Sequence, residues 1–209
     1  MNNDRQILFE NSADRSRIAD QALADADILA ALVENLSAAQ RRIRQFSATA
    51  IKEISVKSPE TLLTHVGAIA DGLHRPEAQT RWECLETLAL LAKLDPTPLA
   101  DAVEGAEVSL FDEESGFARL AALKFLCTYG ALDSGRATQV WPLIREGIQC
   151  YHGDPEFEDM LVCVESFAAG NVGGSVRQLV CQCLQFDADN SKGAIGRRAS
   201  SIVRICQGE

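Results

Sequence analysis

The chain of 209 residues is 46% hydrophobic and 24% charged, a composition that is ordinary for a globular protein and argues against disorder. No apolar stretch approaches the roughly 20 residues that span a bilayer, and the amino terminus lacks the pattern of a secretory signal, so we expect a cytoplasmic protein without a membrane segment. The net charge is −10, and residues 59–115 alone carry 12 acidic and 3 basic residues, which disfavours a nucleic-acid-binding surface.

The first segment, residues 1–23, is predicted to hold a short leading helix over residues 4–21 that is interrupted near Asn11 and Ser12. Ile18 is among its few apolar side chains. The end of a stack of helical repeats exposes the apolar face that an inner repeat would cover. We therefore expect this more polar helix to act as an amino-terminal cap.

The clearest helix-turn-helix unit runs from Pro59 to Ala92. Apolar residues recur there at spacings of three and four, which is the pattern of amphipathic helices. They are Leu62, Val66, Ile69 and Leu73 before the break HRPEAQ, and Leu85, Leu88 and Leu91 after it. Pro59 and Pro76 stand where helices begin, a position that tolerates the missing N–H of proline.

The same pattern recurs in register behind three arginines, Arg44, Arg81 and Arg119. Each is followed by a small residue at plus three, larger side chains at plus seven and plus ten, and a small residue at plus eleven. The arginines are separated by 37 residues (81 minus 44) and by 38 residues (119 minus 81). Such a period is typical of solenoids built from helix pairs.

In the segments HRPEAQTR, ending at Arg81, and DEESGFAR, ending at Arg119, the chain resembles the HEAT and armadillo-type repeats. The resemblance covers about residues 24–207. It implies an all-α fold, an α-α superhelix (solenoid) of about five HEAT-like repeats behind the amino-terminal capping helix. Within a single domain of residues 1–209 we place the repeats at residues 24–57, 59–95, 96–133, 134–171 and 173–207.

The fourth repeat departs from the pattern, because Met160 stands where the others carry arginine, whereas Arg198 restores the arginine in the fifth. We call Arg44, Arg81, Arg119 and Arg198 the anchor arginines. A guanidinium group has five N–H donors and can satisfy several carbonyl or carboxylate acceptors at once, which lysine cannot reproduce. We therefore expect these arginines to be structural rather than a ladder that binds a ligand.

No catalytic constellation is recognisable, and we expect a protein that is not an enzyme and has no cofactor. His65, His74 and His152 are scattered and stand in no zinc-protease or nucleophile motif. The acidic run from Asp112 to Glu114 lies in a turn between helices, where carboxylates ordinarily favour the start of a helix.

The seven cysteines are interpreted as reduced thiols within helices, and we expect no metal site. Cys181 and Cys183 form a C-x-C pair, but residues two apart on a helix point to different sides. The glycine-rich stretch from Gly170 to Arg177 is the best candidate for an anion site, although an ordinary turn between helices explains it as well.

In HEAT-like stacks the second helix of each repeat lines the concave face, which is expected here to be largely acidic. The side chains that we expect to contact a partner are Trp82, Glu83, Glu86, Lys124 and Glu165. The favoured function is a non-catalytic protein-protein interaction scaffold or adaptor for a basic or amphipathic protein segment. A merely solvated face is the structural alternative.

Two other functions stay open at this point. Some DNA glycosylases are built of HEAT-like repeats, so a nucleic-acid-binding protein or an enzyme of that type is the alternative, although the acidic middle of the chain opposes it. The carboxyl-terminal helix has no further cap beyond it, so a second copy of the chain is an alternative partner.

Overall fold

The structure, a computed structural model, describes residues 15–208. Over this range the chain forms eleven α-helices and four short 3-10 helices, and no strand. The all-helical fold class predicted from the sequence is therefore confirmed. Most of the predicted leading helix, residues 4–14, lies outside the described residues, and α2 (Arg15–Ala24) is the part that follows it.

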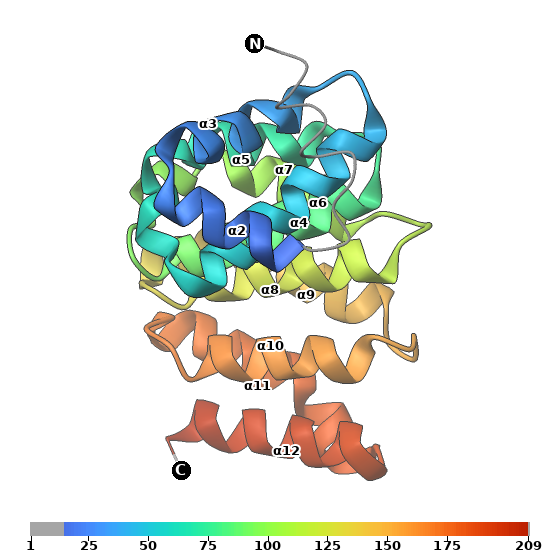
Figure 1. Cartoon of the computed structure of the whole chain (residues 1–209). Helices are drawn as coiled ribbons and strands as arrows, with labels where there is room; N and C mark the ends of the chain where they lie inside the picture. Colours follow the sequence, from blue (N-terminus) through green and yellow to red (C-terminus); the bar gives the residue numbers. More distant parts are fainter. Residues whose placement is uncertain (1–14, 209) are drawn as a thin grey trace. The chain divides into compact units, whose positions relative to one another are not determined.

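The chain divides into two compact units, residues 1–105 and residues 106–209. The boundary falls inside α7 (Ala102–Leu110). Figure 1 shows the helices coloured along the sequence. Each unit is described by itself below, as the first unit and the second unit.

The first unit is built around α4, which packs against α2 on one side and against α6 on the other. Its core is formed by apolar side chains of α4 and α6 that are fully buried, among them Ile51, Ile54 and Leu88. The α-helices of this unit are α2 (Arg15–Ala24), α3 (Ala26–Glu34), α4 (Arg41–Lys57), α5 (Val66–Asp71) and α6 (Ala78–Ala92), and its 3-10 helices are Asn35–Ser37, Pro59–His65, Gly72–His74 and Thr97–Leu99.

One predicted helix of this unit has a different form. The apolar residues between Pro59 and His74 are buried as expected, but the segment is a 3-10 helix, then the short α5, then a second 3-10 turn. Gly67 and Gly72 lower the helix propensity of the segment. At Gly72 the backbone also approaches α6 closely, because a Cβ there would lie 2.6 Å from Cys84 Sγ.

The second unit is built around α10, which packs against α8 on one side and α12 on the other, while α11 packs against α9 and α12 (Figure 1). Phe125, Phe157 and Phe167 are large side chains of its core and are almost wholly buried. Its complete helices are α8 (Gly116–Gly130), α9 (Ser134–Cys150), α10 (Phe157–Ala168), α11 (Gly173–Asn190) and α12 (Gly193–Gln207).

Helix α11 extends to Asn190, so its connection to α12 is only Ser191 and Lys192. Two polar contacts support the last turn of α11. The Gln185 amide donates to the Asp189 carboxylate, and the Asn190 amide donates to the Phe186 carbonyl at 2.8 Å. Such side-chain contacts four residues apart stabilise a helix whose last residues have weak intrinsic propensity.

Candidate protein-binding surface

Arg44 begins the polar framework of the first unit at the start of α4. Its guanidinium donates to the Ala38 and Ala39 carbonyls at 2.7 and 2.9 Å, which closes the turn that precedes its own helix. It also forms an ion pair with the buried carboxylate of Glu77, just before α6. One side chain therefore ties a turn to the helix of the next predicted repeat.

Arg81 repeats the first half of this arrangement at the start of α6. Its guanidinium donates to the Arg75 carbonyl at 2.8 Å and to the Pro76 carbonyl at 2.9 Å. These carbonyls stand six and five residues before the arginine, as Ala38 and Ala39 do before Arg44. The two arginines make the same contacts because the turns that precede α4 and α6 place carbonyls at the same distance in sequence from each arginine.

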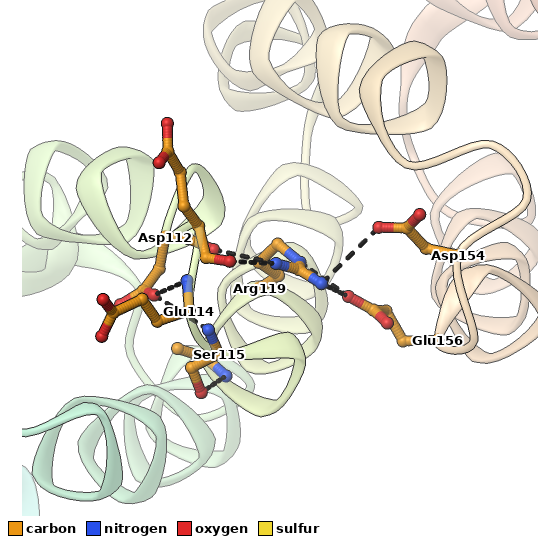
Figure 2. A network of polar contacts seen from close by, with 8 residues as sticks. Asp112, Glu114, Ser115, Arg119, Asp154 and Glu156 are labelled. Carbon is orange, nitrogen blue, oxygen red and sulfur yellow. Dashed lines mark hydrogen bonds and ion pairs between the residues drawn. The ribbon is translucent and has the colours of Figure 1, made fainter.

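Arg119 holds the corresponding position in the second unit, and Figure 2 shows its network. It donates to the Asp112 carbonyl at 3.0 Å, and its Nε donates to Glu156 at 2.6 Å. The Tyr151 ring lies 4.7 Å from the guanidinium carbon, a distance that suits a cation-π contact. Only 12% of the Arg119 side chain and 11% of the Glu156 side chain are exposed, so the pair is shielded from water.

The acidic run before α8 serves this turn, as Figure 2 also shows. The Asp112 carboxylate accepts from the backbone N–H groups of Glu114 and Ser115 at 2.8 and 2.9 Å. The Ser115 hydroxyl is the N-cap of α8 and accepts from Ala118 N–H. These contacts satisfy backbone donors at the start of a helix and leave Asp112 in a structural position.

Arg198 and Met160 show where the pattern changes. Arg198 forms an ion pair with Glu165 of α10, and 35% of its side chain is exposed. Met160 is fully buried in α10 and occupies the position of the missing arginine. That helix instead contributes Glu156, just before its start, as the acceptor for Arg119.

Glu77 gives the first unit a measurable dependence on pH. Burial opposes its ionisation, but the hydrogen bonds from Arg44 and from the backbone outweigh burial and lower the pKa of Glu77. A lowered folded-state pKa stabilises the protein above the pKa of the unfolded chain, about 4.3 for glutamate, and this stabilisation is lost as the pH falls through the folded-state value.

We expect Glu77→Gln to remove part of the acid sensitivity of the first unit. Urea unfolding of the wild type and the variant between neutral pH and about pH 3 measures the difference in its slope with pH. Arg44→Met should remove the same part, and the double variant should remove little more because the two groups act as one pair. Equal slopes for wild type and Glu77→Gln would contradict the assignment.

Helices α4 and α6 are joined by a ladder of polar contacts. Thr49 Oγ1 lies 3.1 Å from Glu83 Oε1, and the Gln79 amide donates to the same hydroxyl at 3.3 Å. Lys52 Nζ lies 3.4 Å from Glu86 Oε2. The ladder joins the two helices and neutralises part of the acidic charge of α6.

The predicted partner-binding residues of α6 differ in how far they are exposed. Glu83 is only 9% exposed, so its carboxylate faces α4 rather than solvent. Trp82 and Glu86 are half-buried, and they lie one turn apart on the same side of the helix as Gln79 and Leu90. Of the three predicted residues of α6, Trp82 and Glu86 therefore retain more exposed surface than Glu83.

The predicted residues of the second unit lie on adjacent helices, Lys124 exposed on α8 and Glu165 half-buried on α10. The Glu165 carboxylate binds Arg198 of α12, so part of its charge is neutralised. Lys124 lowers the pKa of Cys163, although burial dominates and raises the pKa of that thiol to about 11. The charge of Lys124 therefore acts on a side chain of α10.

A polar cluster that the sequence did not reveal joins the connection after α9 to the end of α11. Asp187 is 6% exposed, and its Oδ1 lies 2.9 Å from His152 Nε2 and accepts from the Ser191 hydroxyl at 2.7 Å. Both partners use the same carboxylate oxygen, so the serine is not hydrogen-bonded to the imidazole as a nucleophile is to its base. No spacing signal links residues 152 and 187 in the sequence.

Other candidate chemistry lies in ordinary structural positions. Gly173 begins α11 with a positive φ of 75°, and the Arg177 guanidinium donates to the Gly170 carbonyl at 2.8 Å, which closes the glycine-rich turn. No cluster of three or more potential metal ligands occurs in the part of the chain that the structure describes. Among the helices of residues 15–208, none is both long and apolar enough to cross a membrane.

No protein-family model and no curated protein matches the sequence. Solved structures do match. A designed armadillo repeat protein in complex with the peptide (KR)4 shares 15% identity at a TM-score of 0.74 over 94% of this chain and 95% of that one. An engineered protein matches at 14% identity and a TM-score of 0.77 over 100% and 93%.

The archaeal HEAT-like repeats protein from Thermococcus onnurineus NA1 matches at 14% identity and a TM-score of 0.58, over 98% of this chain and 95% of that protein. Identities this low bear on the fold alone. The paired helices of both units and these three similarities lead to one conclusion. The chain has a HEAT/armadillo-type helical repeat fold.

Proposed function

We propose that the chain is a non-catalytic protein-protein interaction scaffold, and that the second helices of its repeats bind a basic or amphipathic segment of another protein. The observation that carries the proposal is the pairing of Trp82 with Glu86 on α6. An indole and a carboxylate one turn apart, both partly exposed, provide an apolar surface beside an acceptor for a cation.

The charge pattern supports a basic partner for the first unit. Within the first unit, residues 59–105 carry 8 acidic and 3 basic residues, a net charge of −5 (3 minus 8), and this local excess of negative charge attracts a cationic segment. Lys52 opposes binding because it already pairs with Glu86. A cationic side chain of the partner would have to compete with Lys52 for the same carboxylate.

The structural neighbours make the proposal reasonable at the level of the fold. One designed armadillo neighbour is described in complex with a peptide of alternating lysine and arginine. Transferred to this chain, that observation suggests (KR)4 as a first probe. In the second unit, Lys124 and Glu165 remain proposed contacts, and Glu83 is left out because it is buried between helices.

We expect (KR)4 to bind the full chain. Its affinity should fall when Glu86 is neutralised and rise when Lys52, the cation paired with Glu86, is removed. Glu86→Gln should weaken binding about threefold, since it removes one partly exposed charge pair. Lys52→Ala should strengthen binding about threefold, because it removes a cation that competes for Glu86. Isothermal titration calorimetry at low and at physiological salt measures both changes.

Glu34→Gln is the matched control, because Glu34 is an exposed glutamate on α3, the first helix of the first predicted repeat. It changes the net charge by the same amount as Glu86→Gln and should leave the affinity within about 1.5-fold, since distant charges are screened. Equal weakening by the two substitutions would show only non-specific attraction and would contradict the proposed surface.

Duplex DNA tests the alternative function, a nucleic-acid-binding protein or an enzyme of the DNA glycosylase type. The proposal predicts no binding of duplex DNA even at low salt, because the acidic segment repels phosphates. Salt-sensitive binding of the duplex, with no binding of (KR)4, would replace the proposed function with a nucleic-acid-binding one.

A further inference from the structure

Helices α11 and α12 form an antiparallel hairpin whose connection is only Ser191 and Lys192. The Ser200 hydroxyl of α12 lies 3.3 Å from the Ala188 carbonyl of α11. A serine side chain extends one atom beyond Cβ, so this contact requires the two backbones to approach closely. Such an approach is a precondition for a disulfide, whose Cα atoms are about 4.4–6.8 Å apart.

The contact between Ser200 and Ala188 also fixes which residues stand opposite each other farther along the hairpin. Cys206 lies six residues beyond Ser200 on α12, and Cys181 lies seven residues before Ala188 on α11. At about 1.5 Å of rise per residue, the two cysteines stand at levels that differ by about 1.5 Å. They are therefore opposite each other across the hairpin.

Both cysteines lie on the inner sides of their helices. Cys181 is two turns from Ala188 and so shares its side of α11, while Cys206 follows the buried Ile202 and Val203 by four and three residues on α12. Burial raises the pKa of Cys206 to about 11, and the neighbouring Cys181 thiol adds to the increase, whereas Arg177 and the Cys181 backbone oppose it. Both thiols are half-buried, so a small reagent can reach them.

We propose that Cys181 and Cys206 are a dithiol site that reacts with low-molecular-weight disulfides, such as oxidised glutathione, to form a disulfide between α11 and α12. This inference rests on the hairpin alone and is independent of the proposed binding function. The bond would join the two helices of the last predicted repeat at the end opposite their short connection.

The reaction consists of two exchanges. The Cys181 thiolate, its proton lost to solvent, attacks one sulfur of oxidised glutathione, forming a mixed disulfide and releasing one glutathione thiolate. The Cys206 thiolate then attacks the Cys181 sulfur and displaces the second glutathione. Two protein thiols lose two electrons and two protons, and one oxidised glutathione becomes two glutathione molecules.

Cys183 is the matched control, because it is half-buried on the same helix only two residues from Cys181. Residues two apart on a helix point to different sides, and Arg145 of α9 lowers the pKa of Cys183 against the larger effect of burial. Cys183 therefore faces α9, whereas Cys181 faces α12.

The test treats the full folded chain with oxidised glutathione at mildly alkaline pH, blocks free thiols by alkylation and maps disulfides by peptide mass spectrometry. In the wild type we expect the peptide containing Cys206 to be linked to the peptide containing Cys181 and Cys183. The link should persist in Cys183→Ser and disappear in Cys181→Ser and Cys206→Ser. Cys206→Ser should retain glutathione on Cys181, because the second exchange cannot occur.

The oxidised wild type should also unfold at a higher temperature than the reduced form, and dithiothreitol should reverse the increase. The wild-type map needs no substitution, so it stands even if a variant fails to fold. Two results would overturn the proposal. One is a link through Cys183, and the other is a wild-type chain without any link while the exposed Cys150 is fully glutathionylated.

Discussion

Arg119→Ala is expected to lower the free energy of unfolding of the second unit by about 3 kcal/mol. The substitution leaves Glu156 as a largely buried carboxylate without its guanidinium partner and leaves the Asp112 carbonyl without its donor. It also removes the contact with the Tyr151 ring. Urea unfolding followed by circular dichroism measures the loss as a shift of the transition midpoint.

Arg197→Ala is the control for this prediction, because Arg197 is exposed on α12 of the same unit. It should change stability by no more than about 0.5 kcal/mol. A double variant, Arg119→Met with Glu156→Gln, should recover at least half of the loss, since no unpaired charge remains buried. A loss below about 1 kcal/mol for Arg119→Ala would show that the anchor arginine is not a structural requirement.

Phe167→Ala is expected to be more damaging still, at about 4 kcal/mol. Phe167 has no exposed surface, and its ring stacks on Trp141 at a centroid distance of 6.2 Å. It also lies against Gly130, where an added Cβ would be 2.8 Å from the Phe167 ring. Neighbours packed this closely cannot collapse fully into the space that the ring vacates, so a cavity remains.

Phe186→Ala is the control of the same residue type, because Phe186 on α11 is 72% exposed. We expect it to cost less than about 1 kcal/mol. The fluorescence of Trp141 should change in Phe167→Ala and not in Phe186→Ala, which separates loss of the stacked ring from a general loosening. Similar costs for the two substitutions would contradict the described core.

The helical pattern in the sequence was sufficient to predict the all-α fold class. Helices α4 and α8 each begin three residues before an anchor arginine that the sequence pattern singled out, Arg44 and Arg119. The HEAT/armadillo-type resemblance is confirmed at the level of the fold. This success has a physical basis, because an amphipathic helix needs a regular apolar stripe wherever it packs.

The sequence was less informative about the faces of the helices. Glu83 was expected to contact a partner on the concave face, yet its side chain is buried. In the first unit α4 packs directly on α6, so a residue at the edge of the stripe is covered by the neighbouring helix. The sequence of one helix does not show how much of its apolar stripe and edges a neighbouring helix covers, because that depends on packing between segments distant in sequence.

Polar contacts across helices were the least predictable feature. The arginines were recognisable, but Glu77 and Glu156 could not be assigned as their partners, since 33 and 37 residues separate the members of each pair. Asp187 and His152 are separated by 35 residues and carry no motif. The division into repeats and the partner-binding role of Lys124 and Glu165 stay predictions.

The most direct test of the proposed function follows the indole N–H signals of Trp82 and Trp141 by nuclear magnetic resonance during titration with (KR)4. These are the chain's two tryptophans; Trp82 is half-buried on the proposed surface, whereas Trp141 is 4% exposed in the core of the second unit. The proposal predicts a saturable shift of the Trp82 signal with the Trp141 signal unchanged. Binding that leaves the Trp82 signal in place would contradict it.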